Sequence, residues 1–132
     1  MRRKFKANKK VRNATTKVYK GIKFRSKLEL FTYMKLEDAG IKALYEKRKF
    51  TLMEGFRYEQ QSIEPSNKKA TKGEYINNTD KVRDITYTPD FVAPNGKWVI
   101  EVKGFANDVF PLKWKLFKHM LHNYPDPPIL YL

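Results

Sequence analysis

The stretch that decides the fold runs from residue 87 to residue 104 and reads YTPDFVAPNGKWVIEVKG. Its pattern predicts two β-strands joined by a Pro-Asn-Gly turn, with Asp90 near the end of the first strand. Side chains alternate between the two faces of a strand, so Glu101 and Lys103 share one face of the second strand with Val99. The pattern therefore places two carboxylates and an amine together at one edge of a sheet.

This group of side chains suits a divalent metal ion and the water that such an ion activates. Magnesium prefers oxygen ligands, and we expect Asp90, Glu101 and the backbone carbonyl of Val102 to supply them. Lys103 would orient or deprotonate the water and stabilise the developing negative charge. Pro89 fixes the backbone before Asp90 and removes a donor, so strand pairing should end there. The alternative is an ordinary exposed ion pair between an acid and a lysine on one strand.

A helix is expected before this stretch. Ser26 and Glu29 match the capping-box pattern at the start of a helix that begins at about Lys27 and ends at Gly40. Apolar residues occur on most sides of this helix, so we expect it to be covered on several sides. In this interpretation Glu29 has a structural role at the helix start.

The remaining apolar patterns predict a second helix and several strands. The helix is expected over residues 108–122, with Asn107 or Asp108 as its cap and Pro111 in its first turn. The first expected strand lies within residues 41–53, is best seen at residues 49–53, and resumes its alternating pattern at residues 56–58. The other expected strands are residues 82–92, 97–103 and 129–132. The coarse order of helix, three strands, helix and strand indicates a mixed α/β (α+β) fold with helices against the sheet.

Residues 59–81 are polar and poor in apolar side chains, and they predict a long loop or an irregular hairpin extension. We expect a single folded domain over residues 21–132, preceded by a basic, mobile arm at residues 1–20. The chain has no cysteine, which excludes disulfides and thiolate metal sites. No apolar run approaches the length of a membrane span, and we expect a soluble, cytoplasmic protein without a membrane partner.

Positive charge is concentrated near the N-terminus. The net charge is +14, and residues 1–27 contain twelve Lys or Arg and no acid, whereas residues 50–132 are almost neutral. This distribution is typical of a nucleic-acid-binding protein, although a solvated tail or attraction to anionic lipid would give the same pattern. We expect DNA contacts from the basic side chains of this region, namely Arg2, Arg3, Lys4, Lys6, Lys9, Lys10, Arg12, Lys17, Lys20, Lys23 and Arg25.

Three stretches together resemble the PD-(D/E)xK nuclease superfamily: residues 21–29 (GIKFRSKLE), residues 87–91 (YTPDF) and residues 99–104 (VIEVKG) with the helix that follows. Within this superfamily the chain more closely resembles a group of small phage proteins of the Holliday-junction-resolvase or recombination-endonuclease kind. The resemblance covers most of the chain outside residues 1–18 and 59–81.

The resemblance implies a restriction-endonuclease-like core and a site in which Asp90 and Glu101 bind Mg²⁺, for which Mn²⁺ substitutes. It implies that Lys103 is the catalytic lysine and that Glu29 is an additional acid in or beside the metal site. It also implies a homodimer that cuts four-way or otherwise branched DNA in the host cytoplasm. The alternatives are a sequence- or end-specific nuclease of the restriction or transposase type, and a non-catalytic nucleic-acid-binding protein.

Three other titratable residues were candidates for the site. Asp84 is an even number of residues from Asp90, so on one strand both side chains would lie on the same face. Asp84 would then approach the metal, unless it pairs with a neighbouring basic residue. His119 and His122 are three residues apart on the second helix, but they lack a third ligand and are expected to be surface residues.

Overall fold

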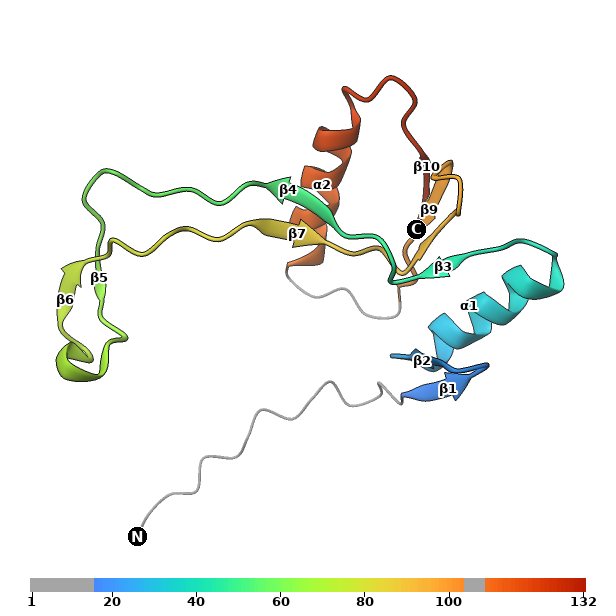
Figure 1. The fold of residues 1–132 in the computed structure, drawn as a ribbon, viewed down its shortest axis with the longest axis horizontal. Coiled ribbons are helices and arrows are strands. Elements are labelled where there is room, and N and C mark those ends of the chain that lie inside the picture. The colour runs from blue at the N-terminus through green and yellow to red at the C-terminus, as the bar shows by residue number, and fades with distance from the viewer. Residues whose placement is uncertain (1–15, 104–108) are drawn as a thin grey trace, which may run out of the picture.

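The computed structural model describes residues 16–103 and 109–132 (Figure 1). A mixed four-stranded sheet in the order β10-β9-β8-β3 forms its centre. These strands are β3 (Leu44–Tyr45), β8 (Phe91–Val92), β9 (Trp98–Ile100) and β10 (Ile129–Tyr131). β8 is antiparallel to both β3 and β9, and β10 runs parallel to β9. The Pro-Asn-Gly turn joins β8 to β9, and Gly96 adopts the φ of +73° that this turn requires.

Helix α1 (Lys27–Asp38) has the start and end that the sequence predicted. The Glu29 N–H donates to Ser26 Oγ over 3.1 Å, which caps the first turn. Gly40 follows the helix with φ +71°, and its N–H donates to the Glu37 carbonyl over 2.9 Å. Before α1, strands β1 (Lys17–Tyr19) and β2 (Ile22–Phe24) pair as a small hairpin, so the folded part begins before residue 20.

Helix α2 (Phe110–Leu121) is the second predicted helix, and Pro111 lies in its first turn as expected. The predicted caps, Asn107 and Asp108, lie outside the described residues. Within the described part of the chain, neither helix is long and apolar enough to cross a membrane.

Two apolar clusters pack on opposite faces of the sheet, as the alternation along β8 and β9 requires. Val92 and Val99 face the first cluster, which α2 covers with Phe110, Phe117 and Leu121. The second cluster lies beneath α1 and the β1–β2 hairpin, and its buried centre is Phe24, Tyr45 and Phe91. The sheet is therefore flanked by a helix on each face.

The outer side of α1 is not covered by any part of the chain that the structure describes. Leu28, Phe31 and Met34 are exposed there, and no residue of the helix is fully buried. The expectation of a helix covered on several sides is thus wrong for the described chain. Leu30, Tyr33 and Leu36 alone carry its contact with the second cluster.

Residues 44–92 fold as one long antiparallel ribbon that starts in the sheet and projects away from it (Figure 1). Beyond the β3–β8 pair, β4 (Phe50–Met53) pairs with β7 (Ile85–Tyr87), and a register shift interrupts this pair. A single bridge between Phe56 and Val82 follows. The outermost pair is β5 (Ile63–Pro65) with β6 (Tyr75–Asn77). Residues 59–81 are accordingly the end of a hairpin.

The mixed α+β class is confirmed, and the elements that form the sheet and cover it follow the predicted order: α1, β3, β8, β9, α2, β10. The assignment of individual strands needs correction. The segment expected within residues 41–53 is divided into two strands: β3 lies in the sheet, whereas residues 50–53, its strongest part, pair with β7 in the ribbon. The strand predicted over residues 82–92 is divided into β7 and β8, with Pro89 between them, and residues 56–58 contribute only the single bridge.

Candidate active site

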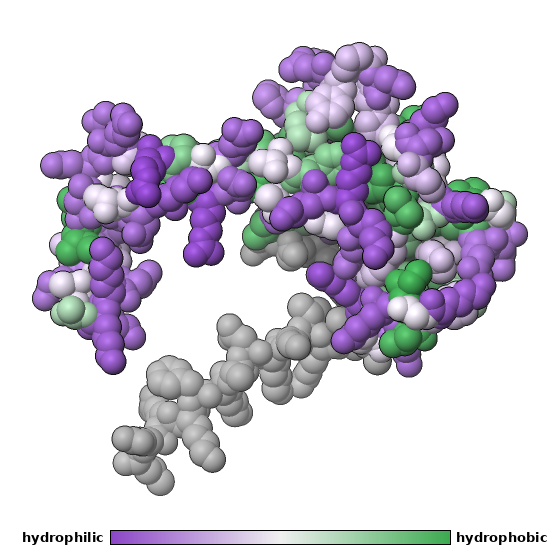
Figure 2. Space-filling view, viewed as in Figure 1, coloured by the Kyte–Doolittle hydropathy of each residue, from purple (hydrophilic) through white to green (hydrophobic). Residues whose placement is uncertain are grey.

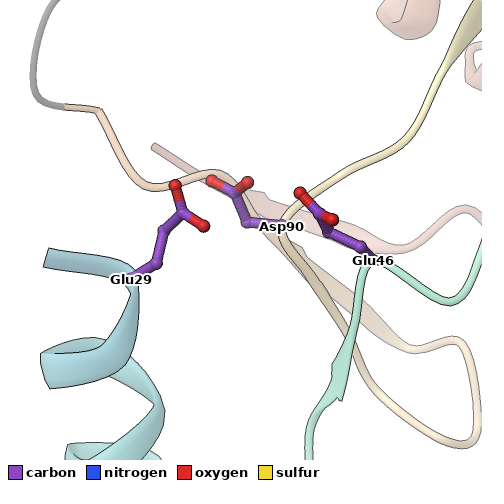
Figure 3. A group of neighbouring side chains, drawn as sticks. All are labelled: Glu29, Glu46 and Asp90. Atoms are coloured by element: carbon purple, nitrogen blue, oxygen red, sulfur yellow. The ribbon is translucent and has the colours of Figure 1, made fainter. Parts of the chain in front are cut away.

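An acidic residue stands at each of three neighbouring strand ends. Because β3, β8 and β9 are antiparallel neighbours, the end of β3, the start of β8 and the end of β9 meet at one edge of the sheet. Glu46, Asp90 and Glu101 occupy these positions. The Glu46 N–H donates to the Asp90 carbonyl over 2.9 Å, which fixes the two backbones side by side. Glu29 approaches the same edge from the first turn of α1 (Figure 3).

Asp90 lies at the centre of this group and is only 9% exposed. Its Oδ2 accepts a 2.8 Å hydrogen bond from the Val102 N–H. This bond ends the ladder of β9 before residue 103, where the sequence had predicted the strand to end, because the Asp90 side chain takes the place of a strand partner. Burial and the neighbouring Glu101 carboxylate raise the pKa of Asp90 to about 7, against the opposing effect of the Val102 N–H.

Glu101 is also 9% exposed, and both of its oxygens are engaged. Oε2 accepts a 2.7 Å bond from the Tyr87 hydroxyl and a 3.3 Å bond from the Asp90 N–H. Oε1 lies 3.6 Å from Lys103 Nζ, and this ammonium group also lies over the ring of Phe110. Burial, together with the bond to Glu101, raises the pKa of the Tyr87 hydroxyl far above its usual value, so Tyr87 remains a donor. Glu101 and Lys103 share a face with Val99, as predicted.

Glu29 is held from two sides. The Ser26 hydroxyl donates to its Oε1 over 3.1 Å, and the Tyr45 hydroxyl donates to its Oε2. Burial raises the pKa of Tyr45 well above its usual range, and the bond to Glu29 raises it further, so the hydroxyl keeps its proton. Tyr45 also accepts a 3.1 Å bond from the Arg25 N–H. Glu29 therefore takes part in the helix cap and has its carboxylate fixed at the sheet edge.

Glu46 is the residue of this group that the sequence analysis missed. It is a non-glycine residue with φ +47°, a left-handed conformation that costs roughly 1–3 kcal/mol and persists only where the surroundings impose it. Burial raises the pKa of its carboxyl group, an effect that the nearby guanidinium of Arg25 opposes. Arg25 Nε lies 3.0 Å from Glu46 Oε1 and supplies a counter-charge at the rim of the site.

The acids present fit a small divalent cation. Glu29, Glu46 and Asp90 each offer a carboxylate oxygen, and these three atoms all lie within 4.8 Å of one another. Opposite ligands of Mg²⁺ are separated by about 4.2 Å, so small side-chain movements would bring all three oxygens to one ion. Carboxylate oxygen is also the ligand type that Mg²⁺ prefers. Figure 3 shows the three carboxylates pointing toward a common region.

The converging carboxylates include two of the acids expected to bind metal, Glu29 and Asp90. The third expected acid, Glu101, is not in this group, and its carboxylate accepts a hydrogen bond from Tyr87 and lies 3.6 Å from Lys103 Nζ. The Val102 N–H donates to Asp90 Oδ2, and the expected role of the Val102 carbonyl as a metal ligand stays a prediction.

Asp84 and the two histidines lie elsewhere. Asp84 Oδ1 accepts a 2.5 Å bond from the Gly55 N–H in the ribbon, so its role is local. His119 and His122 are exposed on and just after α2.

The predicted DNA-binding residues fall into three groups. Lys17 and Lys23 are exposed on the β1–β2 hairpin. Lys20 pairs with Glu37 over 2.9 Å, and Arg25 pairs with Glu46. The others lie outside the described residues: Arg2, Arg3, Lys4, Lys6, Lys9, Lys10 and Arg12.

The chain belongs to a protein family described as "Protein of unknown function (DUF1064)", whose model matches residues 2–127. The match spans every element from β1 to α2, including all the residues of the acidic group. Comparisons with curated proteins and with solved structures found no match. The match therefore assigns the chain to a family but assigns no activity to it, and any statement about function depends on the site itself.

Proposed function

We propose that the protein is a metal-dependent DNA endonuclease of the PD-(D/E)xK type. The observation that carries this proposal is the convergence of Glu29, Glu46 and Asp90 beside the Glu101–Lys103 pair at one sheet edge. The order α1, β3, β8, β9, α2, β10 supports it, since this is the order of the superfamily core that the sequence resembles. The concentration of positive charge before α1 is the complement of a polyanionic substrate.

The three converging carboxylates would hold Mg²⁺, which supplies a coordinated water of lowered pKa and neutralises charge on the phosphate. In the net reaction one P–O bond of the backbone is hydrolysed, the attacking water loses a proton and the leaving oxygen gains one. Four acids at one edge would repel a phosphodiester unless a cation were bound. The acids also repel one another, since burial and then the charge of Glu101 raise the pKa of Asp90.

Lys103 is the cationic side chain best placed to act on the attacking water or on the developing charge. Its Nζ lies 3.6 Å from Glu101 and over the Phe110 ring, and its side chain is only 25% exposed. An ammonium group held in this way can donate hydrogen bonds to a phosphate oxygen or orient a water molecule. Glu101 fixes the position of Lys103 and also bonds to the backbone of Asp90, so it links the lysine to the metal-binding acids.

The proposed substrate is branched DNA such as a Holliday junction, and the proposed active form is a homodimer, because paired cuts across a junction require two sites. This part of the proposal rests on the resemblance to phage resolvases. A sequence- or end-specific nuclease would use the same site and is distinguished only by its substrate.

The test compares cleavage of a four-way junction, a linear duplex and a single strand, each with Mg²⁺, Mn²⁺ or EDTA. Asp90→Asn and Glu101→Gln keep the size of the side chains, and we expect both to abolish cleavage while DNA binding persists. Lys103→Ala should also spare binding and reduce cleavage. Asp126→Asn, an exposed change in the loop after α2, is the matched control and should cut like the wild type.

If the wild type binds DNA but cuts none of the three substrates with either metal, the protein is a binding module and the nuclease proposal is wrong. Cutting by Asp90→Asn at the wild-type rate would equally remove this site from the chemistry. Sedimentation of the protein with and without a junction tests the dimer.

A further inference from the structure

The end of the ribbon is a two-stranded arm that contributes no residue to the proposed site. It contains β5, β6 and a short 3₁₀ turn (Lys69–Thr71), and it projects from the body of the molecule (Figure 1). A two-stranded hairpin is marginally stable in water when nothing packs on it. On this arm Ile63 is 60% exposed and Tyr75 is 71% exposed. Figure 2 shows its visible surface as mainly hydrophilic with isolated apolar patches.

Hydrogen bonds at Ser66, rather than apolar packing, shape the tip of this arm. Ser66 is 4% exposed, its N–H donates to the Glu74 carbonyl over 2.7 Å, and its carbonyl accepts from the Gly73 N–H over 3.1 Å. Its hydroxyl is 2.7 Å from Thr71 Oγ1 and accepts a 3.2 Å bond from the Lys68 N–H. The side chains on this turn are thus presented from a fixed backbone, which lowers the entropy lost on binding.

The tip is basic. Residues 67–73 contain Lys68, Lys69 and Lys72 and no acid, and all three lysines are exposed. In the part of the chain that the structure describes, none of them forms an ion pair, unlike Lys20 and Arg25. Three unpaired ammonium groups on one ordered turn complement a row of phosphates.

The shape of the arm fits a groove of duplex DNA. The major groove is about 12 Å wide and admits a two-stranded β-ribbon. The chain runs back thirteen residues from Asp90 to Asn77 at the end of β6, and an extended chain of that length spans up to about 43 Å. One turn of B-DNA is about 34–36 Å long, so the arm is long enough to reach the duplex one turn from the acidic site.

We propose that the β5–β6 arm enters a groove of duplex DNA about one helical turn from the acidic site, with Lys68, Lys69 and Lys72 on the phosphates. The inference that the arm binds one turn from the cleavage site rests on the proposed function. The inference that the arm contacts DNA does not. The arm then sets the minimum length of duplex that the protein needs beside the site.

The test measures binding to a duplex of about four helical turns in EDTA, over a series of salt concentrations. Each phosphate contact contributes about −0.9 to the slope of log K against log salt concentration. The variant Lys68→Gln/Lys69→Gln/Lys72→Gln should flatten the slope by up to about 2.7 units. The control Lys42→Gln/Lys97→Gln/Lys115→Gln removes the same charge from exposed positions on the body, and its slope should change much less.

Two further measurements separate the arm from a general loss of charge or of folding. The variant Lys68→Arg/Lys69→Arg/Lys72→Arg should restore the wild-type slope, since it keeps the three charges. Hydroxyl-radical footprints should lose protection about one turn from the main footprint in the glutamine variant only. If the glutamine and control variants have equal slopes and footprints, the proposal is wrong. It is equally wrong if the arm variant binds DNA normally but changes the oligomeric state, since the arm then contacts protein.

Failure of the nuclease proposal looks different from failure of this one. If the protein never cuts DNA but its salt slope depends on the arm lysines, the arm proposal stands and the nuclease proposal is wrong. If the protein cuts junctions at the acidic site but its salt slope does not depend on the arm lysines, the nuclease proposal stands and the arm proposal is wrong.

Discussion

The Asp90 carboxyl group should lower the stability of the metal-free protein at neutral pH, and Asp90→Asn should relieve this cost. Asparagine keeps an oxygen to accept the 2.8 Å bond from the Val102 N–H but carries no charge. The folded-state pKa of Asp90 is raised from 3.8 to about 7, chiefly by burial and by Glu101. A shift of about three pKa units corresponds to about 4 kcal/mol, which is an upper limit because the site can relax.

The direction of the pH dependence follows from the raised pKa. Between pH 3.8 and about 7 the folded chain keeps a proton on Asp90 that the unfolded chain releases, so the free energy of unfolding falls as the pH rises. The loss of stability caused by ionised Asp90 is absent below this pH range and complete above it. We therefore expect Asp90→Asn to match the wild type near pH 4 and to exceed its stability by about 2–4 kcal/mol at pH 8.

Urea denaturation in EDTA, at fixed ionic strength from pH 4 to pH 8.5, measures this difference directly. The control Asp126→Asn is exposed and should stay within about 0.5 kcal/mol of the wild type throughout. Saturating Mg²⁺ should narrow the gap, because a ligand at ten times its Kd stabilises the wild type by about 1.4 kcal/mol and Asp90→Asn binds it poorly. A stability difference between the two chains that does not change with pH would refute the reasoning, since Asp90 would then not carry a buried, repelled charge.

Three further changes test other parts of the structure. Glu46→Gln should weaken Mn²⁺ binding at least about tenfold in a calorimetric titration, and an unchanged affinity would remove Glu46 from the site. Gly55→Ala would place a Cβ 2.6 Å from the Val82 carbonyl oxygen, and should cost about 1–3 kcal/mol and speed hydrogen exchange in the ribbon. Phe117 is fully buried under the sheet, and Phe117→Ala should cost about 3–5 kcal/mol in urea denaturation; a loss below 1 kcal/mol would contradict the packing of α2.

Local signals in the sequence were sufficient for the elements that short-range chemistry defines. The Pro-Asn-Gly turn and the alternation after it predicted the β8–β9 hairpin, and the side chains fall on the expected faces. Ser26 and Gly40 marked the ends of α1 correctly, because a cap and a left-handed glycine act within a few residues. These features placed Asp90, Glu101 and Lys103 together without knowledge of the rest of the fold.

Glu46 could not be found in this way, because its place depends on pairing across the chain. It meets Asp90 only because β3 pairs with β8, two short strands separated by the whole ribbon. Its backbone conformation, with φ +47°, gives no signal in a glutamate. The only local indication was an acid directly after an aromatic residue at the end of an apolar stretch, a pattern too common to be used.

The segment expected within residues 41–53 is divided into two strands, and its weaker part joins the sheet, for a related reason. Residues 50–53 have the stronger strand pattern, and they do form a strand, but a register shift lies between Thr51 and Met53 where β4 pairs with β7. Bulges of this kind bend the strand and increase its twist, and they disrupt the pairing locally. Alternation of apolar residues indicates that a segment is extended, but it does not indicate which strand that segment pairs with.

The two roles considered for Glu29 are compatible in the structure. A capping glutamate with a purely structural role and a metal-binding glutamate were alternatives in the sequence. In the structure the Ser26 hydroxyl donates to one carboxylate oxygen and the Tyr45 hydroxyl to the other, so the residue that caps α1 also helps to fix the carboxylate at the sheet edge. A carboxylate held by two donors loses little further freedom when a cation binds. If Glu29 binds metal as proposed, Ser26→Ala should weaken metal binding as well as the helix, whereas a purely structural cap would change stability alone.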